Sequence, residues 1–430
     1  MLNLSKMGVI KNYDSLAKNE NRKVALELIE SAFASITPDE VFKANFSYEN
    51  GILKLADQTF DLNQFERVHL IGLGKGSAGY SKLIEEALGE KLTQGFDIDA
   101  VESPGFNKVE YTKGTHPLPS QINIDYTKKV LEKTSGLNEK DFVLVVICGG
   151  GSAMFEEPLN LSFEKLEKLF KDMLNSGADI TEMNIVRKHV SRVKGGNLAK
   201  HLHPATVASL IFSDVPGNDL ATIASGTTVK DNHTLDEAKA VIAKYNLGED
   251  VTDEDFSETP REDKYFEKVH NILMLSNLTA IHAMQKRAEE LGYSTRVWTD
   301  HLTGDARETG QKLINEAHPG EILLAGGETT IKITGTGKGG RNQALALCAL
   351  PYISDNVLLA PFSTDGWDFY EFTGAMVDIE TVKKVNDENI DQNAYLSNDD
   401  SYGFFEKTGD GILTGKQESN VSDLYIVIKK

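Results

Sequence analysis

Three apolar runs in this chain each end directly in a glycine-rich turn, and this arrangement restricts the possible folds more than any other feature. The turns lie at residues 71–77, 148–152 and 337–343. A buried strand that passes through a glycine turn into a helix is typical of parallel α/β sheets. Glycines also let backbone N–H groups approach an anion closely, and the following helix offers its positive end. The sequence therefore predicts an α/β protein with phosphate-binding turns.

The length of the chain favours two domains, because 430 residues exceed what one ordinary hydrophobic core supports. Strands alternate with helices in the first part, whereas the second part is richer in hairpins. An acidic stretch at 248–263 separates them. We therefore predict domains of residues 1–250 and 251–430. A long surface loop within one domain is the alternative interpretation of this stretch.

Composition and charge exclude several classes of protein. The contents of 40% hydrophobic and 26% charged residues describe a globular protein that is soluble. An excess of 65 acidic over 45 basic residues, a formal charge of −20, disfavours nucleic-acid binding. Cys148 and Cys348 are far apart within apolar stretches, which predicts two free thiols and a reducing compartment. The first thirty residues hold no apolar signal segment and no run suits a membrane span, so we expect a cytoplasmic protein.

Periodicity and turn signals predict the secondary structure. Amphipathic spacing predicts a helix at 21–34, and an uninterrupted apolar run predicts a buried strand at 141–148. Further helices are expected at 78–88, 164–176, 190–201, 234–245, 276–291, 307–317 and 342–349. Further strands are expected at 68–72, 206–213, 294–299, 321–325, 329–334, 357–363 and 424–428.

The first glycine turn carries a lysine, Lys75, between Gly74 and Gly76. The turn lacks the third glycine of a dinucleotide fingerprint and the Ser or Thr that follows the lysine of a Walker A loop. A tight structural turn would explain Gly72 and Gly74 but not the lysine, whose ammonium we expect over the start of the next helix. Lys75 and the two glycines are therefore candidates for phosphate binding.

The other two turns are candidates for related reasons. Consecutive glycines cost the chain much conformational entropy, so they indicate that a ligand approaches the backbone; a close helix crossing is the alternative. The third turn also places Arg341 at the start of a helix, where its charge suits a phosphoryl group. The candidate cofactor-binding residues of these turns are Gly149, Gly150, Gly151, Ser152, Gly339 and Gly340.

Charged side chains near two predicted strands add further candidates. Asp214 and Asp365 come just past predicted strands, at the edge where open α/β sheets bind ligands. They suit Mg²⁺ or a hydroxyl proton, with ordinary turn composition as the alternative. The basic residues Arg187 and Lys188 stand out in an acidic chain. They are candidates for binding a substrate carboxylate or phosphate, with a solvated helix face as the alternative.

Read together, the ordered motifs of the chain resemble the glycerate 2-kinase family that carries a C-terminal MOFRL domain. So many motifs in order are far more specific than any one glycine loop, and they extend over nearly the whole chain. The matching segments are residues 72–75, 115–119, 149–153, 184–191, 194–196, 213–215, 223–226, 302–307, 326–330, 339–343 and 420–424.

The resemblance implies a fold and an activity. It implies an N-terminal Rossmann-like domain with a doubly wound parallel sheet and a C-terminal α/β domain of the MOFRL type with a mixed sheet. It also implies an ATP- and Mg²⁺-dependent kinase that phosphorylates the 2-hydroxyl of D-glycerate in a cleft between the two domains. A homodimer is a further expected assembly.

The resemblance also assigns roles to individual residues. The active-site cations of the family correspond to Lys75 and Arg341, and Asn342 is expected to contact the substrate. Because phosphoryl transfer depends on positioning and charge neutralisation, these cations suit it. We expect Mg²⁺ to be held by carboxylates, one of which orients the attacking hydroxyl. The candidate metal ligands are Asp214, Glu328 and Asp365, and the candidate catalytic carboxylates are Asp214 and Asp365.

Three segments depart from the family pattern and concern the acceptor. A threonine replaces a proline within 225–228, aromatic residues crowd 367–372, and 414–421 gains two charges. We therefore expect glycerate or a related small hydroxy acid as the acceptor. One alternative function is a nicotinamide-dependent oxidoreductase, which Lys75 and the incomplete fingerprint disfavour. The other is a ligand-binding sensor that has lost turnover, which the retention of both cations disfavours.

Overall fold

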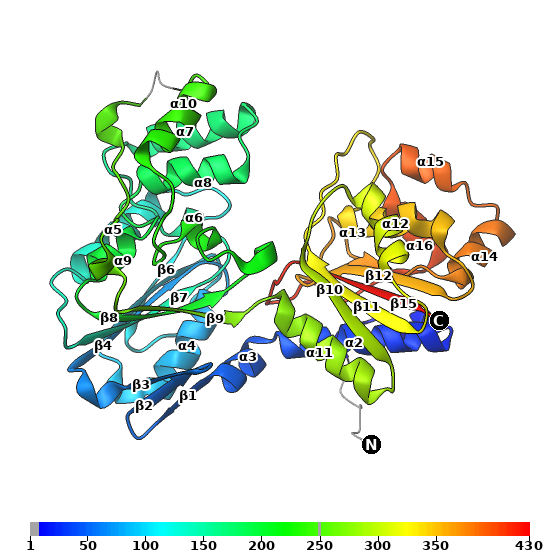
Figure 1. The fold of residues 1–430 in the computed structure, drawn as a ribbon, viewed down its shortest axis with the longest axis horizontal. Helices are drawn as coiled ribbons and strands as arrows, with labels where there is room; N and C mark the ends of the chain where they lie inside the picture. Colours follow the sequence, from blue (N-terminus) through cyan, green and yellow to red (C-terminus); the bar gives the residue numbers. More distant parts are fainter. Residues whose placement is uncertain (1–7, 248–250) are drawn as a thin grey trace. The chain divides into compact units, whose positions relative to one another are not determined.

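The computed structural model describes residues 8–247 and 251–430 (Figure 1). This part of the chain forms two compact units, each built around its own large sheet. The parallel-sheet unit comprises residues 42–213 and 218–274. The mixed-sheet unit comprises the chain up to Val41 together with 214–217 and 275–430. The predicted α/β fold with one parallel and one mixed sheet is confirmed.

The two units are not divided at residue 250, where the sequence placed the domain boundary. Residues 248–250 themselves lie outside the described residues. The stretch from 251 to 274 belongs to the parallel-sheet unit, because it leads into that sheet's edge strand. Residues 8–41 belong instead to the mixed-sheet unit, because a helix there packs on that unit's sheet.

The sheet of the parallel-sheet unit has the strand order β6–β5–β4–β7–β8–β9. In chain order this is 3-2-1-4-5-6, the order of a doubly wound dinucleotide-binding fold, whose direction of winding reverses between β4 and β7. All seven residues of β7 are buried, as expected for a strand covered on both faces. The strands are β4 (Arg67–Leu73), β5 (Gln94–Asp99), β6 (Val109–Lys113), β7 (Asp141–Ile147), β8 (Thr206–Phe212) and β9 (Val269–Leu275).

Helices and a small antiparallel sheet complete this unit. Helices α7, α8 and α10 form a lobe with a core of its own above the sheet (Figure 1). The helices are α4 (Ser77–Leu88), α5 (Gln121–Lys133), α6 (Gly151–Met154), α7 (Phe163–Asn175), α8 (Ile180–His189), α9 (Asn197–Leu202) and α10 (Leu235–Lys244). The small sheet consists of β1 (Phe46–Glu49), β2 (Ile52–Leu55) and β3 (Gln58–Asp61).

The sheet of the mixed-sheet unit has the order β10–β11–β15–β12–β13–β14. Strands β10 and β11 run parallel, whereas β15 runs antiparallel to both β11 and β12. The carboxyl ends of β11 and β12 therefore lie on either side of the amino end of β15. The strands are β10 (Ser294–Leu302), β11 (Glu321–Gly327), β12 (Val357–Ser363), β13 (Gly374–Ala375), β14 (Gly411–Ile412) and β15 (Asp423–Lys429).

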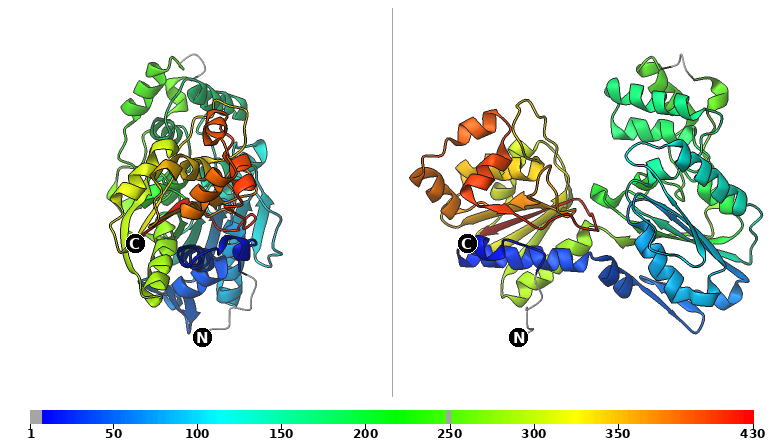
Figure 2. Two further views of the ribbon diagram at one scale, coloured as in Figure 1. Left: turned by 90° about the vertical axis from the view of Figure 1, so that its right-hand side faces the viewer. Right: turned by 180° about the vertical axis from the view of Figure 1, so that it is seen from behind.

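Helices cover both faces of the mixed sheet. Helices α2 and α11 lie side by side on one face, and α12, α13 and α16 lie on the other (Figures 1 and 2). The helices are α1 (Tyr13–Leu16), α2 (Glu20–Ser35), α11 (Asn277–Glu290), α12 (Ala306–Glu316), α13 (Arg341–Ala349), α14 (Ile379–Asp387), α15 (Gln392–Ser397) and α16 (Ser401–Thr408). The remaining helix, α3 (Pro38–Asn45), contains the passage from one unit to the other.

A buried arginine fixes α2 to the mixed-sheet unit. The guanidinium of Arg22 donates to Asp378 at 2.6 Å and to Asp410 at 2.7 Å, and it is fully buried. Lys18, whose side chain is 35% exposed, also reaches Asp410 at 2.9 Å. On the sheet side, the ring of Phe33 contacts Phe362 of β12. These contacts explain why a helix so early in the sequence folds with the C-terminal part.

Two predicted elements are wrong. The expected helix at 190–201 is interrupted, because Gly195 and Gly196 adopt positive φ angles and only α9 follows them. The expected strand at 329–334 forms only an isolated bridge between Thr330 and Asp305.

Both cysteines are free, as predicted, although Cys348 is only partly buried. No helix in residues 8–247 and 251–430 has the length and hydropathy that a membrane span requires.

Candidate active site

The glycine turns after β4 and β7 lie next to each other in the parallel-sheet unit. Leu73 and Ile147, the last residues of these strands, pair in register, and Lys75 N donates to Gly149 O at 2.8 Å. Gly74 has a φ of +105°, and a Cβ there would collide with the carbonyl of Cys148. Because ligands of doubly wound sheets bind where the winding reverses, the two turns mark the candidate site of this unit.

Lys75 and His116 both face Gly150. A Cβ on Gly150 would lie 2.7 Å from the His116 ring and 3.4 Å from Lys75 Cε, so only glycine leaves this space open. Partial desolvation and the nearby Lys75 ammonium lower the pKa of His116, which favours a neutral imidazole. Lys75 is exposed, and no ion pair to it occurs in the described part of the chain. His116 lies in the matching segment 115–119, but nothing in the sequence indicates that it meets Lys75, because this segment is far from both turns in the chain.

The helix that follows Lys75 already has a carboxylate at its start. Asp99 Oδ2 accepts hydrogen bonds from Gly76 N at 2.9 Å and Ala78 N at 3.1 Å. Beneath it, Asp97 accepts from Ser81 at 2.6 Å, and burial raises the pKa of Asp97 to about 7. The positive end of α4 thus faces an internal anion, contrary to the expected phosphate cradle. Gly72 serves packing, since a Cβ there would collide with Asp97.

The second turn, residues 149–152, differs because no carboxylate caps it within the described residues. Gly151 packs closely, since a Cβ there would lie 2.6 Å from Leu73 and 3.0 Å from Ala224. Ser152 Oγ lies 2.8 Å from Ser225 Oγ, which in turn donates to Asn184 at 3.1 Å. Because no internal carboxylate occupies it within the described residues, this turn stays a candidate for phosphate binding.

The loop beside the second turn has a strained backbone. Ala224 and Ser225 have φ angles of +47° and +55°, in the left-handed region that favours glycine. Non-glycine residues persist in this region where their surroundings fix them, and such strain gathers at functional sites. The segment 225–228, which departs from the family pattern, therefore lies directly against the glycine turn through Ser225 and Ser152.

The two basic candidates of α8 have different surroundings. Arg187 is partly exposed, lies 5.1 Å from the Phe170 ring centre, and makes only a long 3.5 Å contact with Asn184. Burial lowers the pKa of Arg187, with Glu156 acting in the opposite direction. Lys188 is buried and pairs with the buried Asp231 at 3.0 Å, so its ammonium is already neutralised. Arg187 suits an anionic ligand, whereas Lys188 has a structural partner.

In the mixed-sheet unit, three strand ends bring the other candidates together. Gly327 at the end of β11 and Ser363 at the end of β12 both pair with Asp423 at the start of β15. Glu328 follows the end of β11 directly, and Asp365 lies two residues after the end of β12. Figure 1 shows β15 in red between its two neighbours. Carboxylates that lie up to about a hundred residues apart in the sequence are therefore close together at this edge of the mixed sheet.

Arg341 begins α13 and binds two of these carboxylates. Its guanidinium donates to both oxygens of Asp423, at 2.6 and 3.0 Å, and to Glu328 at 2.6 Å. Asp423 is fully buried, and Arg341 opposes the burial that raises the pKa of Asp423. Burial likewise raises the pKa of Glu328, with Arg341 opposing it and with Asp423 and Asp214 adding to it. Asp423 was not predicted as a site residue, because in the sequence it is an ordinary residue at the start of a strand.

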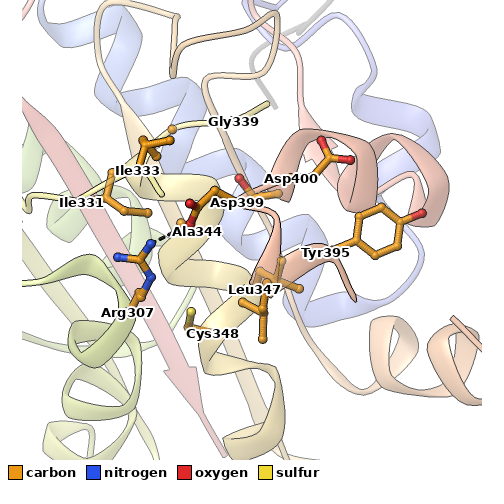
Figure 3. Close-up of a pocket in the computed structure, with 13 residues that line it drawn as sticks. Arg307, Ile331, Ile333, Gly339, Ala344, Leu347, Cys348, Tyr395, Asp399 and Asp400 are labelled. Atoms are coloured by element: carbon orange, nitrogen blue, oxygen red, sulfur yellow. Dashed lines mark hydrogen bonds and ion pairs between the residues drawn. The ribbon is translucent and has the colours of Figure 1, made fainter. Parts of the chain in front are cut away.

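The third glycine turn does not form the expected phosphate cradle, because its N–H groups and its helix have internal partners. Gly337 N donates to Asn398 O at 2.8 Å, and Lys338 N donates to Asp400 Oδ1 at 3.1 Å. Just before the turn, Asp399 accepts from Gly335 N at 2.7 Å and pairs with Arg307, as Figure 3 shows. Asp368 caps α13, accepting from Gln343 N at 2.8 Å and Asn342 N at 3.3 Å. Gly340 lets this buried carboxylate approach, since a Cβ there would collide with Asp368, and Gly339 does the same for Ser401.

The remaining candidates of this edge are Asn342 and the metal ligands. The buried Asn342 side chain lies against the Asp423 carboxylate, and its Oδ1 has no hydrogen-bond partner in the described chain, which suits a ligand contact. Asp365 Oδ1 accepts from Ser363 Oγ at 2.8 Å and Trp367 N at 2.9 Å. No group of three or more metal-binding side chains occurs within residues 8–247 and 251–430. Oxygen ligands such as Asp365 still fit Mg²⁺, which usually binds one or two carboxylates together with substrate phosphates.

Both parts of the sequence match described families. Residues 24–255 match the family described as "Domain of unknown function (DUF4147)", and residues 321–423 match the MOFRL family. A D-glycerate 2-kinase of Thermotoga maritima is 34% identical over 94% of this chain and 97% of its own length. A glycerate 2-kinase of Pyrococcus horikoshii is also 34% identical, over 95% of this chain and 97% of its own length.

The fold shows the same similarity. The crystal structure of a glycerate kinase from Thermotoga maritima superposes with a TM-score of 0.84 and 33% sequence identity. The superposition covers 95% of this chain and 99% of that chain. The similarity therefore includes both units and the sheet edges that carry the candidate residues.

Proposed function

Since the chain belongs to the glycerate 2-kinase family with DUF4147 and MOFRL regions, we propose that it transfers a phosphoryl group from ATP to the 2-hydroxyl of D-glycerate or a related small hydroxy acid. The products are ADP and, from glycerate, 2-phosphoglycerate. The observation that carries the proposal is the uncapped turn 149–152 beside Lys75, at the point where the winding of the sheet reverses.

We assign phosphate binding in the parallel-sheet unit to that turn and to Lys75. The backbone of Gly149, Gly150 and Ser152 supplies dipoles, and the exposed Lys75 ammonium supplies a full charge without an internal competitor. Bound ATP and Mg²⁺ supply the transferable phosphoryl group and neutralise part of its charge. Arg187, desolvated and weakly partnered, is assigned to an anionic group of the substrate.

In the mixed-sheet unit, Arg341 is assigned to the charge that develops during transfer. Asp423 and Glu328 hold its guanidinium in one orientation, so little reorganisation is needed when charge appears. Asp365 is assigned to orient the attacking hydroxyl, because its turn is fixed by hydrogen bonds to Ser363 and Trp367. Glu328 and Asp214, which interact electrostatically, are the further candidate ligands of Mg²⁺.

Product analysis tests this function. The purified protein is incubated with ATP, Mg²⁺ and D-glycerate, and ADP release is followed together with enolase, which consumes 2-phosphoglycerate directly. ADP release coupled to enolase without added phosphoglycerate mutase supports the 2-kinase. A signal that requires the mutase would identify the 3-hydroxyl instead. Reduction of hydroxypyruvate by NADH without ATP turnover would favour the oxidoreductase, and ligand binding without turnover would favour the sensor.

A further inference from the structure

Two aromatic side chains are exposed just after Asp365 at the edge of the mixed sheet. Trp367 is 40% exposed and Phe369 is 67% exposed. Phe369 also has a φ of +63°, a conformation that a bulky residue rarely adopts. Such strain is unfavourable and is found most often at ligand-binding and active sites. The turn therefore presents two rings to solvent at a cost to stability.

Internal contacts hold this aromatic turn rigidly beside the helix of Arg341. Asp368, which lies between the two exposed rings, is buried and caps α13 through its carboxylate. Its backbone N–H donates to Phe372 O at 3.0 Å, and the Phe372 ring stacks on Tyr402 at 5.0 Å. The rings are thus fixed in place near the candidate catalytic groups.

The segment 415–419 packs against this turn. Gln417 N donates to Asp365 O at 2.8 Å, and Lys416 Nζ lies 4.9 Å from the centre of the Trp367 ring. Gly366, with a φ of +76°, allows its backbone to contact Gly415. Two of the three segments that depart from the family pattern therefore form one structure next to Asp365.

The same segment lines a pocket of about 260 Å³, and Lys416 belongs both to this pocket and to the contact with Trp367. Phe33, Ile36 and Pro38 at the end of α2 provide apolar walls, and Lys416, Glu418 and Ser419 provide polar groups. Ser419 Oγ is buried without a hydrogen-bond partner in the described chain. A buried hydroxyl without a partner is unfavourable, so a hydrogen bond to a ligand oxygen there would be stabilising.

We propose that Trp367, Lys416 and this pocket bind the far end of an acceptor longer than glycerate, which makes polyhydroxy aldonic acids the acceptor class. The inference rests on the proposed function and specifies its substrate. The C–H face of the carbon chain packs on Trp367, Lys416 donates to hydroxyl oxygens, and Ser419 makes the hydrogen bond that it lacks. D-Glycerate has only three carbons and therefore lacks this far end.

Chain-length selectivity tests the proposal. We compare kcat/KM for D-glycerate with kcat/KM for D-erythronate and D-gluconate, which share its configuration at carbon 2. The wild type should use at least one longer acid more efficiently than D-glycerate. Lys416→Gln and Trp367→Ala should each lower kcat/KM for that acid about tenfold, as expected for loss of a charge-assisted hydrogen bond or a packed ring, and leave D-glycerate within about twofold.

The matched control is Lys312→Gln, because Lys312 lies 5.4 Å from the Trp298 ring centre in the same unit and does not line the proposed pocket. This variant should retain the wild-type ratio. A wild type that uses D-glycerate but none of the longer acids would overturn the inference and leave the proposed function intact. An unchanged ratio in Lys416→Gln would also overturn it. If no acid is phosphorylated, the affinity for D-gluconate is measured by calorimetry for the wild type and for Lys416→Gln. Weaker binding by Lys416→Gln would support the subsite, and equal binding would overturn it.

Discussion

At the scale of single residues, Lys75 and Arg341 carry the same charge in very different surroundings. Lys75 is exposed and has no ion pair in the described chain, so its removal leaves no buried group without a partner. Arg341 neutralises Asp423, which is fully buried. Loss of Lys75 should therefore affect activity alone, whereas loss of Arg341 should affect both activity and folding.

For Lys75→Ala we expect kcat to fall about 10²-fold or more, because a preorganised charge on the transferring group is lost. The melting temperature should stay within about 1 °C of wild type, since the side chain makes no buried contact. Steady-state kinetics and thermal unfolding measure the two quantities. Lys54→Ala, another exposed lysine of the same unit, serves as the control. Near-normal turnover in Lys75→Ala would remove the residue from the reaction.

For Arg341→Ala we expect a similar loss of kcat and, in addition, a loss of about 3–5 kcal/mol in the free energy of unfolding. The reason is the uncompensated carboxylate of Asp423. Adding Asp423→Asn to this variant should restore part of the stability without restoring turnover. Denaturant titration of the single and double variants measures the effect. Equal stability of Arg341→Ala and wild type would contradict this account of the pair.

At the scale of elements, two helix starts are capped by buried aspartates from a later part of the chain. Asp99 caps α4 after Lys75, and Asp368 caps α13 at Arg341. Local sequence cannot reveal such caps, because the partner residues lie about twenty-five positions away. The glycine turns were correctly located from sequence. The expected anion at two of them is an internal carboxylate.

The cap of α13 should make stability depend on pH. Burial raises the pKa of Asp368 to about 7, well above its unfolded value. Between about pH 4 and pH 7 the folded state therefore binds the additional proton, and stability falls as pH rises through this range. Asp368→Asn cannot titrate but still accepts the helix N–H groups. Its free energy of unfolding should fall less than that of wild type between pH 5 and pH 8, as measured by denaturant titration. Parallel curves for the two proteins would refute this assignment.

At the scale of the whole molecule, the sequence predicted the two sheets but not the division of the chain between them. The apolar periodicity of residues 21–34 correctly predicts a helix that buries one face, and the structure has this helix as α2, Glu20–Ser35. The periodicity does not reveal which of the two units covers that face. Only the contacts of Arg22 with Asp378 and Asp410, more than 350 residues away, answer that question. Asp423 was missed for the same reason, because its role arises only when three strand ends meet.

The contact between α2 and its unit gives a prediction at this scale. Arg22→Ala should lower the free energy of unfolding by about 3–5 kcal/mol, because two buried carboxylates lose their partner. Lys18→Ala removes a half-exposed charge from the same Asp410 and should cost less than about 1 kcal/mol. Denaturant unfolding of both variants makes the comparison. Similar losses in the two variants would show that burial does not decide the strength of these pairs.

The early position of α2 also matters while the protein is being made. Its apolar face leaves the ribosome long before β12 and β15, which cover it and lie more than 300 residues later in the chain. The whole parallel-sheet unit is synthesised in between and can fold during that time. A newly made chain therefore carries an uncovered apolar helix through most of translation, and this helix is where a chaperone is expected to bind first.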